Sequence, residues 1–543
     1  MRLGSGRAAA LALVLAAAPC RAAGPIIVEP VTGLPVKWDS SRPVLYNLET
    51  GRLNANISNA QGAQAIALAF QTWTNLPGVS LRVSPGTTIA MDITEGNVGT
   101  FLGKTDGLTP IVFDDTGKIT DLVLGEGASD VVLGFATPEI VRPGTNQIVE
   151  GFACMNGKAM ETESPESILN LMVHELGHML GVGHSQLNGD LIFDGDAANN
   201  ATIPVMFPIL RSTSPDSPRL LPTPTLDDEV SMGFLYPSAT YTSRGGNIGG
   251  RVLRAGAEFR GANVIARKLD DPRATAVSWP SGVSTLTGGA YETHLLPPGQ
   301  YSIEVEPIDP TFTGGSSIGA FDPPPTGIPP EFFSAPNEVS DPTIDDPHQK
   351  TPVTVKAGQV AGGIDIVLND STVALNPGAE TTKLIQKTGT IYETGGALPA
   401  FQYTVPIGDA ASTLTITLVQ KNGQPIDLFV RNAAAVSDGA GGTVLADASV
   451  TGTGDSKSLL LSRGTTPALK AGTYFVALVN RGTASADYTL TASFASPLTA
   501  STIGGTGSGG GCTMRRGATA DEPVNALLLL SPLALVLVLR RRG

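Results

Sequence analysis

Hydrophobic residues recur at helical spacing in three stretches of the first half of the chain. In residues 65–73 they follow i, i+3, i+4, i+7 spacing, which predicts an amphipathic helix. A second helix is expected over 165–180, where Ser164 can cap the first turn and Gly181 can end the last one. A third, short helix is expected over about 226–235. Apolar runs between the first two helices predict strands over 79–83, 88–93, 110–113, 120–124, 131–135 and 147–154.

Alternation of apolar and polar residues replaces the helical spacing after residue 237. The alternating runs predict two groups of strands, the first at 250–253, 262–268, 299–306 and 364–368, the second at 400–405, 413–418, 427–431, 456–462, 472–479 and 487–494. A Pro-, Gly- and Asp-rich stretch, 307–352, is expected to be a long loop. The expected fold class is therefore multidomain. An α+β domain (a twisted mixed sheet plus three helices) over 34–237 is followed by two all-β sandwich modules over 245–370 and 376–495.

The composition agrees with several β-rich domains and argues against one class of binding partner. The chain has 543 residues, enough for roughly three or four domains. Its formal net charge is −14, which argues against a nucleic-acid partner, because nucleic acid selects basic surfaces. With 41% hydrophobic residues the chain can form real cores, and its 64 glycines and 41 prolines fit turn-rich β modules and linkers.

The two ends of the chain have the composition of export signals. Residues 1–23 combine a basic start, an apolar run and small residues, which predicts a secretory signal peptide. A Gly/Ser/Thr-rich linker over 496–511 precedes a tail over 512–543 that holds Cys512, an apolar run expected to be a transmembrane helix, and three arginines. The tail resembles bacterial CTERM-type sorting tails, whose removal leaves the protein at the cell surface. A simple membrane anchor is the alternative. We therefore expect an exported, cell-surface or extracellular bacterial protein that contacts the membrane through this helix, either permanently or only until the tail is processed.

The clearest chemical signal is a cluster of histidines. The chain has five histidines, and three of them fall within eleven residues, in His174-Glu-Leu-Gly-His178-Met-Leu-Gly-Val-Gly-His184. His174 and His178 are four residues apart on the second predicted helix, so their rings share one face. Gly181 allows the chain to leave the helix sharply, which can bring His184 round as a third ligand. Three imidazoles suit zinc with one position left open for water, and Glu175 is placed to act on that water.

This sequence resembles the zinc signature of the metzincin metalloproteases. The segment around Met206 resembles the Met-turn of the matrixin subgroup, and 225–237 resembles the final matrixin helix. The resemblance implies that His174, His178 and His184 bind one catalytic Zn²⁺, that Glu175 is the general base, and that Met206 gives structural support below the metal. It also implies that 131–136 is the cleft-edge strand, along which a protein or peptide substrate would pair.

The two β modules carry weaker resemblances. The first is similar to carboxypeptidase-regulatory-like repeats, on the motif Leu296-Pro-Pro-Gly-Gln-Tyr301. The second resembles the pre-peptidase C-terminal domain found on many secreted bacterial proteases. The segments that carry this second resemblance are 425–430, 471–476 and 487–492. These resemblances imply modules that bind, space or anchor.

Two acidic clusters offer oxygen ligands for calcium. One follows His184 and comprises Asp190, Asp194, Asp196 and Asn199; the other comprises Asp114, Asp115 and Asp121. Neither has the spacing of an EF-hand loop. A solvated acidic loop is the alternative for the first cluster, and a turn at Thr116-Gly117 is the alternative for the second.

The function expected from these features is that of a secreted or surface-associated zinc endopeptidase. Zinc-activated water would hydrolyse peptide bonds, with Glu175 as the general base. The alternative is a catalytically silent surface adhesion protein on a metzincin scaffold. A metal-dependent hydrolase acting on a non-peptide bond also fits the motif.

Overall fold

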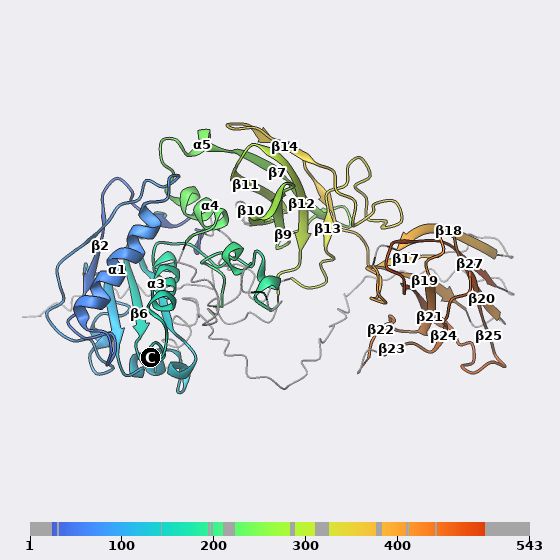
Figure 1. Ribbon diagram of the computed structural model, residues 1–543, viewed down its shortest axis with the longest axis horizontal. Coiled ribbons are helices and arrows are strands. Elements are labelled where there is room, and N and C mark those ends of the chain that lie inside the picture. Colours follow the sequence, from blue (N-terminus) through green and yellow to red (C-terminus); the bar gives the residue numbers. More distant parts are fainter. Residues whose placement is uncertain are drawn as a thin grey trace, which may run out of the picture.

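The computed structural model describes residues 24–494 except 30–31, 143, 194–195, 197–198, 210–222, 283–287, 310–324, 376–382, 392, 409–410, 412 and 440–442. Its elements fall into three groups that follow one another along the chain (Figure 1). The structure is multidomain, mostly β-sandwich-like, with few helices. The predicted signal peptide 1–23, the linker 496–511 and the tail 512–543 lie outside the described residues.

The first group combines one mixed sheet with helices. Its strands are β1 (Lys37–Trp38), β2 (Val44–Leu48), β3 (Val83–Pro85), β4 (Pro110–Asp114), β5 (Gly134–Val141) and β6 (Gln147–Asn156). The sheet order is β1-β6-β4-β2-β3, all parallel, and β5 pairs antiparallel with β6. Its main helices are α1 (Asn59–Thr74), α2 (Lys118–Leu124), α3 (Pro165–Met179) and α4 (Leu226–Leu235). The three helices expected from apolar spacing are therefore present.

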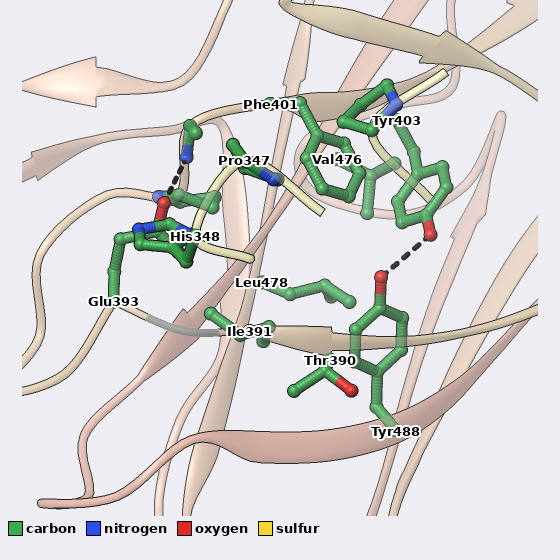
Figure 2. A pocket seen from close by; sticks show the side chains of 13 residues that line it. Pro347, His348, Thr390, Ile391, Glu393, Phe401, Tyr403, Val476, Leu478 and Tyr488 are labelled. Atoms are coloured by element: carbon green, nitrogen blue, oxygen red, sulfur yellow. Dashed lines mark hydrogen bonds between the residues drawn. The ribbon is translucent and has the colours of Figure 1, made fainter. Parts of the chain in front are cut away.

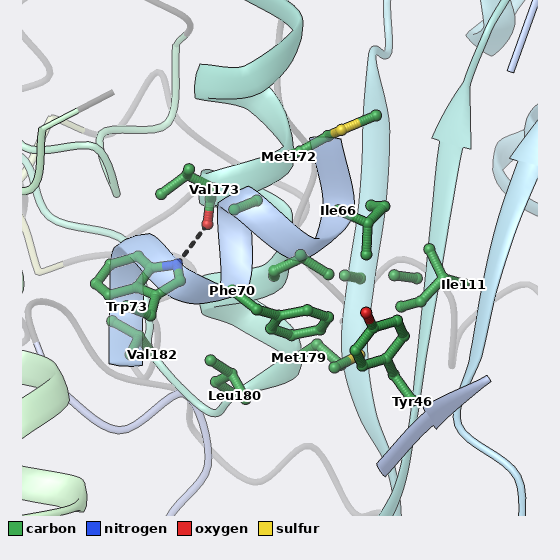
Figure 3. Packing of buried hydrophobic residues seen from close by; sticks show 14 of the residues in the cluster. Tyr46, Ile66, Phe70, Trp73, Ile111, Met172, Val173, Met179, Leu180 and Val182 are labelled. Carbon is green, nitrogen blue, oxygen red and sulfur yellow. Dashed lines mark hydrogen bonds between the residues drawn. The ribbon is translucent and has the colours of Figure 1, made fainter. Parts of the chain in front are cut away.

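Strand β6 has apolar residues on both sides, and each face of the sheet is covered by its own hydrophobic cluster. Ala153 and Met155 face the cluster formed with α1 and α3, whereas Phe152 and Cys154 belong to a second cluster with α2. In the first cluster, residues of α1 meet residues of α3, and the indole Nε1 of Trp73 donates a hydrogen bond of 2.7 Å to the carbonyl of Val173 (Figure 3). This bond fixes α3 against α1 one residue before the first histidine of the motif.

Two of the strands predicted in this domain are absent, and two others begin later than predicted, since β3 begins at Val83 and β5 at Gly134 instead of at residues 79 and 131. Residues 120–124 belong to the helix α2, because Gly117 adopts a φ of 76° and Asp114 accepts hydrogen bonds from the N–H and hydroxyl of Thr120, at 2.7 and 2.8 Å. These contacts turn the chain into a helix before the β-branched run can extend. Residues 88–93 form no strand; they contribute buried Ile89 and Ile93 to the second cluster from a loop.

The first described residues pair with the end of the histidine motif. Ile26 donates a backbone hydrogen bond to Gly181 at 2.7 Å, and Gly183 donates to Gly24 at 2.8 Å. Pro25 and Val182 form the bridge between these bonds. The segment therefore supports the turn that leads to His184.

The second group is a pair of β-sheets, preceded by the short helix α5 (Tyr241–Arg244). One sheet contains β9 (Asn263–Lys268), β10 (Asp271–Pro280), β12 (Gly299–Glu306), β13 (Glu331–Phe332) and β14 (Val353–Val355). The other contains β7 (Gly246–Arg254), β8 (Ala257–Glu258), β11 (Ala290–Leu296), β15 (Val360–Ala361) and β16 (Ile366–Val367). Apolar residues of both sheets share one core, as in a sandwich. Strands β10 and β11 were absent from the sequence-based expectation.

The third group is a second sandwich with its own core. One sheet has the order β17 (Thr372–Ala374), β19 (Gln402–Ile407), β26 (Gly472–Asn480), β21 (Ile426–Asn432) and β24 (Ala448–Val450). The other has β18 (Lys383–Ile391), β27 (Ala486–Phe494), β20 (Thr413–Gln420) and β25 (Ser456–Ser462), and a small hairpin pairs β22 (Ser437–Asp438) with β23 (Val444–Leu445). All six strands expected here are present.

A pocket lies where the second and third groups meet (Figure 2). Pro347 and His348, from the loop after β13, face Phe401 and Tyr403 at the start of β19. Tyr403 and Tyr488 share a hydrogen bond of 2.7 Å between their hydroxyl groups at one side of this pocket. The loop after β13 therefore forms part of the junction between the two sandwiches.

The prediction of a membrane contact through a C-terminal transmembrane helix is corrected. No helix in the described part of the chain is long and apolar enough to cross a membrane. The apolar run on which the prediction was based lies within 512–543, outside that part. The expected transmembrane segment and its membrane partner are withdrawn.

Candidate metal centre

Three imidazole rings meet at the end of α3. The Nε2 atoms of His174 and His178 are 3.1 Å apart, those of His178 and His184 are 3.1 Å apart, and those of His184 and His174 are 3.2 Å apart. The three residues are 1%, 0% and 2% exposed. The two histidines of α3 and the one beyond Gly181 thus present one nitrogen each to a common point, at which a metal ion could be held.

Backbone carbonyls fix the orientation of two of these rings. Nδ1 of His174 lies 2.7 Å from the carbonyl oxygen of Val205, and Nδ1 of His178 lies 2.9 Å from that of Val182. With Nδ1 donating to these carbonyls, each ring presents an unprotonated Nε2 to the other. Lone pairs that face each other at 3.1 Å repel, and a cation between them removes this repulsion.

The separations fit a tetrahedral zinc site. Zn–N bonds of about 2.0–2.1 Å at tetrahedral angles place the ligand nitrogens about 3.3 Å apart. The observed Nε2 separations of 3.1–3.2 Å are close to this value. Three nitrogen ligands without a nearby thiolate suit Zn²⁺ and leave the fourth position open.

Gly181 and Gly177 make this geometry possible in different ways. Gly181 has a φ of 99°, so it adopts a conformation that L side chains avoid and directs the chain away from α3 towards His184. A Cβ on Gly177 would lie 2.6 Å from Sδ of Met206 and 2.8 Å from Trp73. The absence of a side chain at Gly177 therefore lets Met206 pack directly beneath the helix that carries two of the histidines.

A single carboxylate holds in place the loop that contains Val205 and Met206, called the Met206 loop below. Asp228, in the first turn of α4, accepts hydrogen bonds from the backbone N–H groups of Val205 at 2.9 Å and Met206 at 3.1 Å. It also accepts from the N–H and hydroxyl of Thr225. Since Val205 in turn contacts His174, α4 positions a ring that it does not touch. The sequence showed Asp228 only as an acidic residue in a helix N-terminus, and Gly177 only as a helix residue.

Glu175 follows the first of the three histidines on α3 and is buried. Its side chain is 0% exposed and packs against Gly134 of β5, whose Cβ would lie 3.1 Å from Cγ of Glu175. Burial raises the pKa of Glu175 well above its usual range, and it lowers the pKa of His178 to about 4. Of the predicted site residues, the three histidines converge, Met206 lies against Gly177 of the same helix, and Gly181 follows the end of α3.

The acidic clusters predicted as possible calcium ligands are not gathered into sites. Asp114 caps the start of α2, Asp115 pairs with Arg52 at 3.2 Å, and Asp121 accepts from the Ser129 N–H at 2.9 Å. In the described part of the cluster that follows His184, Asp190 and Asp196 belong to no group of converging metal ligands. Asp194 lies outside the described residues.

The second group of elements, called the second domain from here on, packs on the segment that follows His184. Asp309 donates a backbone hydrogen bond to the Gln186 side chain at 2.8 Å, and Leu187 packs against Ile265 of β9. On α4, Phe234 packs on Trp279 of β10, with ring centroids 5.0 Å apart. The metal centre is thus supported by two domains. The sequence does not predict this contact, because the spacing of apolar residues assigns Leu187 to no helix or strand.

Comparison with known proteins gives no assignment. No family model matches the chain, and no curated protein matches it. Solved structures match parts of it. The pre-peptidase C-terminal domain of collagenase from Bacillus anthracis is 15% identical, covering 22% of this chain and 92% of that chain, with a TM-score of 0.16.

Two pilins match larger parts. The major pilin subunit of Bacillus cereus is 10% identical over 46% of this chain and 59% of that chain, with a TM-score of 0.15. The major pilin SpaD from Corynebacterium diphtheriae is 15% identical over 44% of this chain and 57% of that chain, with a TM-score of 0.14. At these scores the matches carry no functional argument. Of the resemblances stated from the sequence, the comparisons support only a weak, low-coverage likeness to a pre-peptidase C-terminal domain.

Proposed function

We propose that this protein is an exported zinc endopeptidase of metzincin type whose first domain carries the active site. The observation that carries the proposal is the convergence of the Nε2 atoms of His174, His178 and His184 within 3.1–3.2 Å, next to a buried carboxylate. Zinc held by these rings would polarise the scissile carbonyl and lower the pKa of water beside it.

The chain's own groups suit the remaining steps of peptide hydrolysis. Glu175 follows the first ligand directly on α3, and its buried side chain also contacts the Ala136 backbone. The positive charge of a bound zinc ion would favour the ionised form of Glu175, in which it can accept the proton of an attacking water. The same carboxyl group can return that proton to the leaving amine. The Val205 and Val182 carbonyls would keep the two helical rings in the tautomer that presents Nε2.

Strand β5 supports a peptide as the substrate. In the described part of the sheet, β5 pairs only with β6, so its outer edge has no neighbouring strand. Gly134 at its start touches Glu175. An extended peptide that added to this edge would run past the carboxylate, with main-chain hydrogen bonds setting its register.

The experiment compares protease activity and metal content in matched variants. The full chain, loaded with one equivalent of zinc, is incubated with casein or gelatin, and Glu175→Gln and His178→Ala are tested beside it. We expect Glu175→Gln to keep its zinc and to lose activity by about 10²–10⁴-fold, since it removes the general base alone. His178→Ala should lose both the bound zinc and the protease activity. Equal activity in wild type and Glu175→Gln would refute the proposal.

A second candidate function is favoured by the burial of the site. All three histidines and Glu175 are at most 2% exposed, so little of the candidate metal centre is open to solvent, as expected of a zinc ion that only stabilises the fold. In this case the chain is a surface adhesion protein in which zinc stabilises a silent metzincin scaffold. Zinc-loaded wild type that cleaves neither protein nor a peptide library, yet loses stability when zinc is removed, would select this function.

A further inference from the structure

A second group of converging ligands lies in the β-sandwich domain, away from the histidines. Glu331 belongs to β13, and Glu338 and Asp345 come from the loop that follows it. Each contributes one carboxylate oxygen to a group in which all of these atoms lie within 4.8 Å of one another. Glu331 is 1% exposed and Asp345 is 0% exposed. Buried carboxylates at this separation repel one another unless protons or a cation intervene.

No basic side chain compensates this cluster. In the described part of the chain, no ion pair joins Glu331, Glu338 or Asp345 to a lysine or arginine, and the further charge near Glu338 is that of acidic Asp365. Burial raises the pKa of Glu331 to about 9 and that of Glu338 to about 7, and Asp345 adds to both shifts. A bound cation would therefore favour the ionised form of these carboxyl groups.

An independent observation also points to an ion. Asn369, just after β16, is 5% exposed, and its Nδ2 donates to Oε1 of Glu331 at 3.0 Å and to the carbonyl of Asp345 at 3.2 Å. Its amide nitrogen thus contacts two of the acidic residues, the carboxylate of Glu331 and the backbone carbonyl of Asp345. Oδ1 of the same group is buried and accepts no hydrogen bond. A buried acceptor without a partner is costly, and a cation would satisfy it.

Backbone groups hold the carboxylates in position for such an ion. Glu338 accepts from the N–H groups of Ser334 at 2.6 Å and Val367 at 2.9 Å, and Asp345 accepts from Val339 at 2.9 Å. Each of these carboxylate oxygens keeps a further lone pair. The oxygen ligands come from an irregular loop and a strand end, an arrangement that suits the flexible coordination of Ca²⁺ better than the strict octahedron of Mg²⁺.

We propose that Glu331, Glu338, Asp345 and Oδ1 of Asn369 form a calcium site in the second domain. Four side-chain oxygens supply half or more of the six to eight ligands that Ca²⁺ takes, and water supplies the rest. The site would join the loop after β13 to the end of β16. Since Pro347 and His348 of this loop line the pocket against Tyr403 (Figure 2), calcium would stiffen the junction between the two sandwiches.

The test measures calcium binding to the full chain. Protein loaded with one equivalent of zinc, in metal-depleted buffer, is titrated with CaCl₂ in a calorimeter at pH 7.5. We expect one site with a dissociation constant below about 1 mM, weaker binding of MgCl₂, and a rise in melting temperature on adding calcium. Absence of a calcium site, or equal affinity for magnesium, would overturn the proposal.

Variants separate this site from the rest of the molecule. Glu331→Gln and Asp345→Asn each keep the size of the side chain and should abolish calcium binding. Asp270→Asn removes an exposed charge of the same domain and should bind as wild type does. His178→Ala should give the same calcium isotherm, so failure of the zinc proposal leaves this result intact. If the cluster variants do not fold, amide hydrogen exchange of the wild type is measured with and without calcium. Slower exchange in residues 333–352 on adding calcium would support the calcium site, and unchanged exchange would refute it.

Discussion

Nη1 of Arg267, on β9, donates a hydrogen bond of 2.6 Å to Oδ1 of Asn188, four residues after the third histidine. Arg267 also pairs with Glu304 and Glu306 of β12, the latter at 3.1 Å, and its side chain is largely buried. The second domain thus contacts the metal-binding segment through a charged group whose position is fixed by two carboxylates. Changes in this domain should therefore reach the metal centre.

Arg267→Ala should destabilise the chain by about 3 kcal/mol, because it leaves Glu304 buried and unpaired. The loop after His184 should also lose hydrogen-exchange protection. Urea unfolding and exchange measurements check both effects. Arg251→Ala, which breaks an exposed pair with Glu258, is the control and should cost less than about 1 kcal/mol. Equal effects of the two variants would contradict the expectation.

Asp228→Asn should weaken zinc binding by about 10–100-fold, because the amide cannot accept from all of Val205, Met206 and Thr225. The Val205 carbonyl would then move relative to His174. Competition with a fluorescent zinc chelator measures the change. The control Glu229→Gln changes the same turn of α4, but Glu229 contacts Gly78 and Arg244, so this variant should keep the wild-type zinc affinity. An equal loss of affinity in both variants would show that the effect does not come from the contacts of Asp228.

Asp227 should make stability depend on pH. Burial raises its pKa to about 7, Asp228 adds to the rise, and the N–H of Ser278, the Ser185 side chain and Arg267 oppose it. Between about pH 4 and pH 7 the unfolded chain has released a proton that the folded chain retains. Stability therefore falls as pH rises, by up to ~1.4 kcal/mol per pH unit.

The variant Asp227→Asn should remove this contribution. Urea unfolding at pH 5, 6, 7 and 8 compares the two proteins, so that the other titrating groups cancel. We expect the variant to gain stability relative to wild type across this range and the difference to level off above pH 7. A difference that does not change with pH would show that Asp227 is charged throughout.

Removing zinc should lower the melting temperature. At a free zinc concentration 100-fold above its dissociation constant, binding contributes about 2.7 kcal/mol to the folded state. Scanning calorimetry with and without 1,10-phenanthroline, at constant calcium, measures this loss. The variant His184→Ala should melt at the same temperature in both conditions. If the melting temperature of the wild type does not change with the chelator, no metal is held at these histidines.

Gly177→Ala should destabilise the first domain by about 1–3 kcal/mol, because its Cβ would lie 2.6 Å from Sδ of Met206. Alanine favours a helix, so the loss would come from packing alone. The matched change is Gly99→Ala, where a Cβ would meet nothing within 4 Å. Thermal unfolding compares the two, and a stabilised Gly177→Ala would show that Met206 can move aside.

The spacing of apolar residues was sufficient to predict the helices and strands that bury one face in a hydrophobic core. The apolar residues of α1 recur at helical spacing, and α3 has Ser164 at its cap and Gly181 beyond its end, so both helices were predicted from local signals. The alternating strands of the third domain were predicted for the same reason. The strand predicted over residues 120–124 was wrong because the side chain of Asp114, six residues before Thr120, hydrogen-bonds to Thr120 and supports a helix there.

The site was predictable in its ligands but not in its supports. Four-residue spacing on a helix followed by a glycine brings the three histidines together through local geometry. Asp228 and Arg267 act through contacts with residues 22 and 79 positions away, and no local pattern encodes such contacts. The cluster around Glu331 joins β13, its following loop and the end of β16, so its members show no ligand spacing in the sequence.

The pairing of Gly24 with Gly183 has a practical consequence for purification. A polyhistidine tag fused ahead of Gly24 would emerge one residue from His184 and bring competing imidazoles to the metal centre. Recombinant protein tagged in this way could bind nickel or zinc in stoichiometries that say nothing of the native ligands. Metal analysis calls for an untagged chain, or one whose affinity handle is cleaved off before the ion is counted.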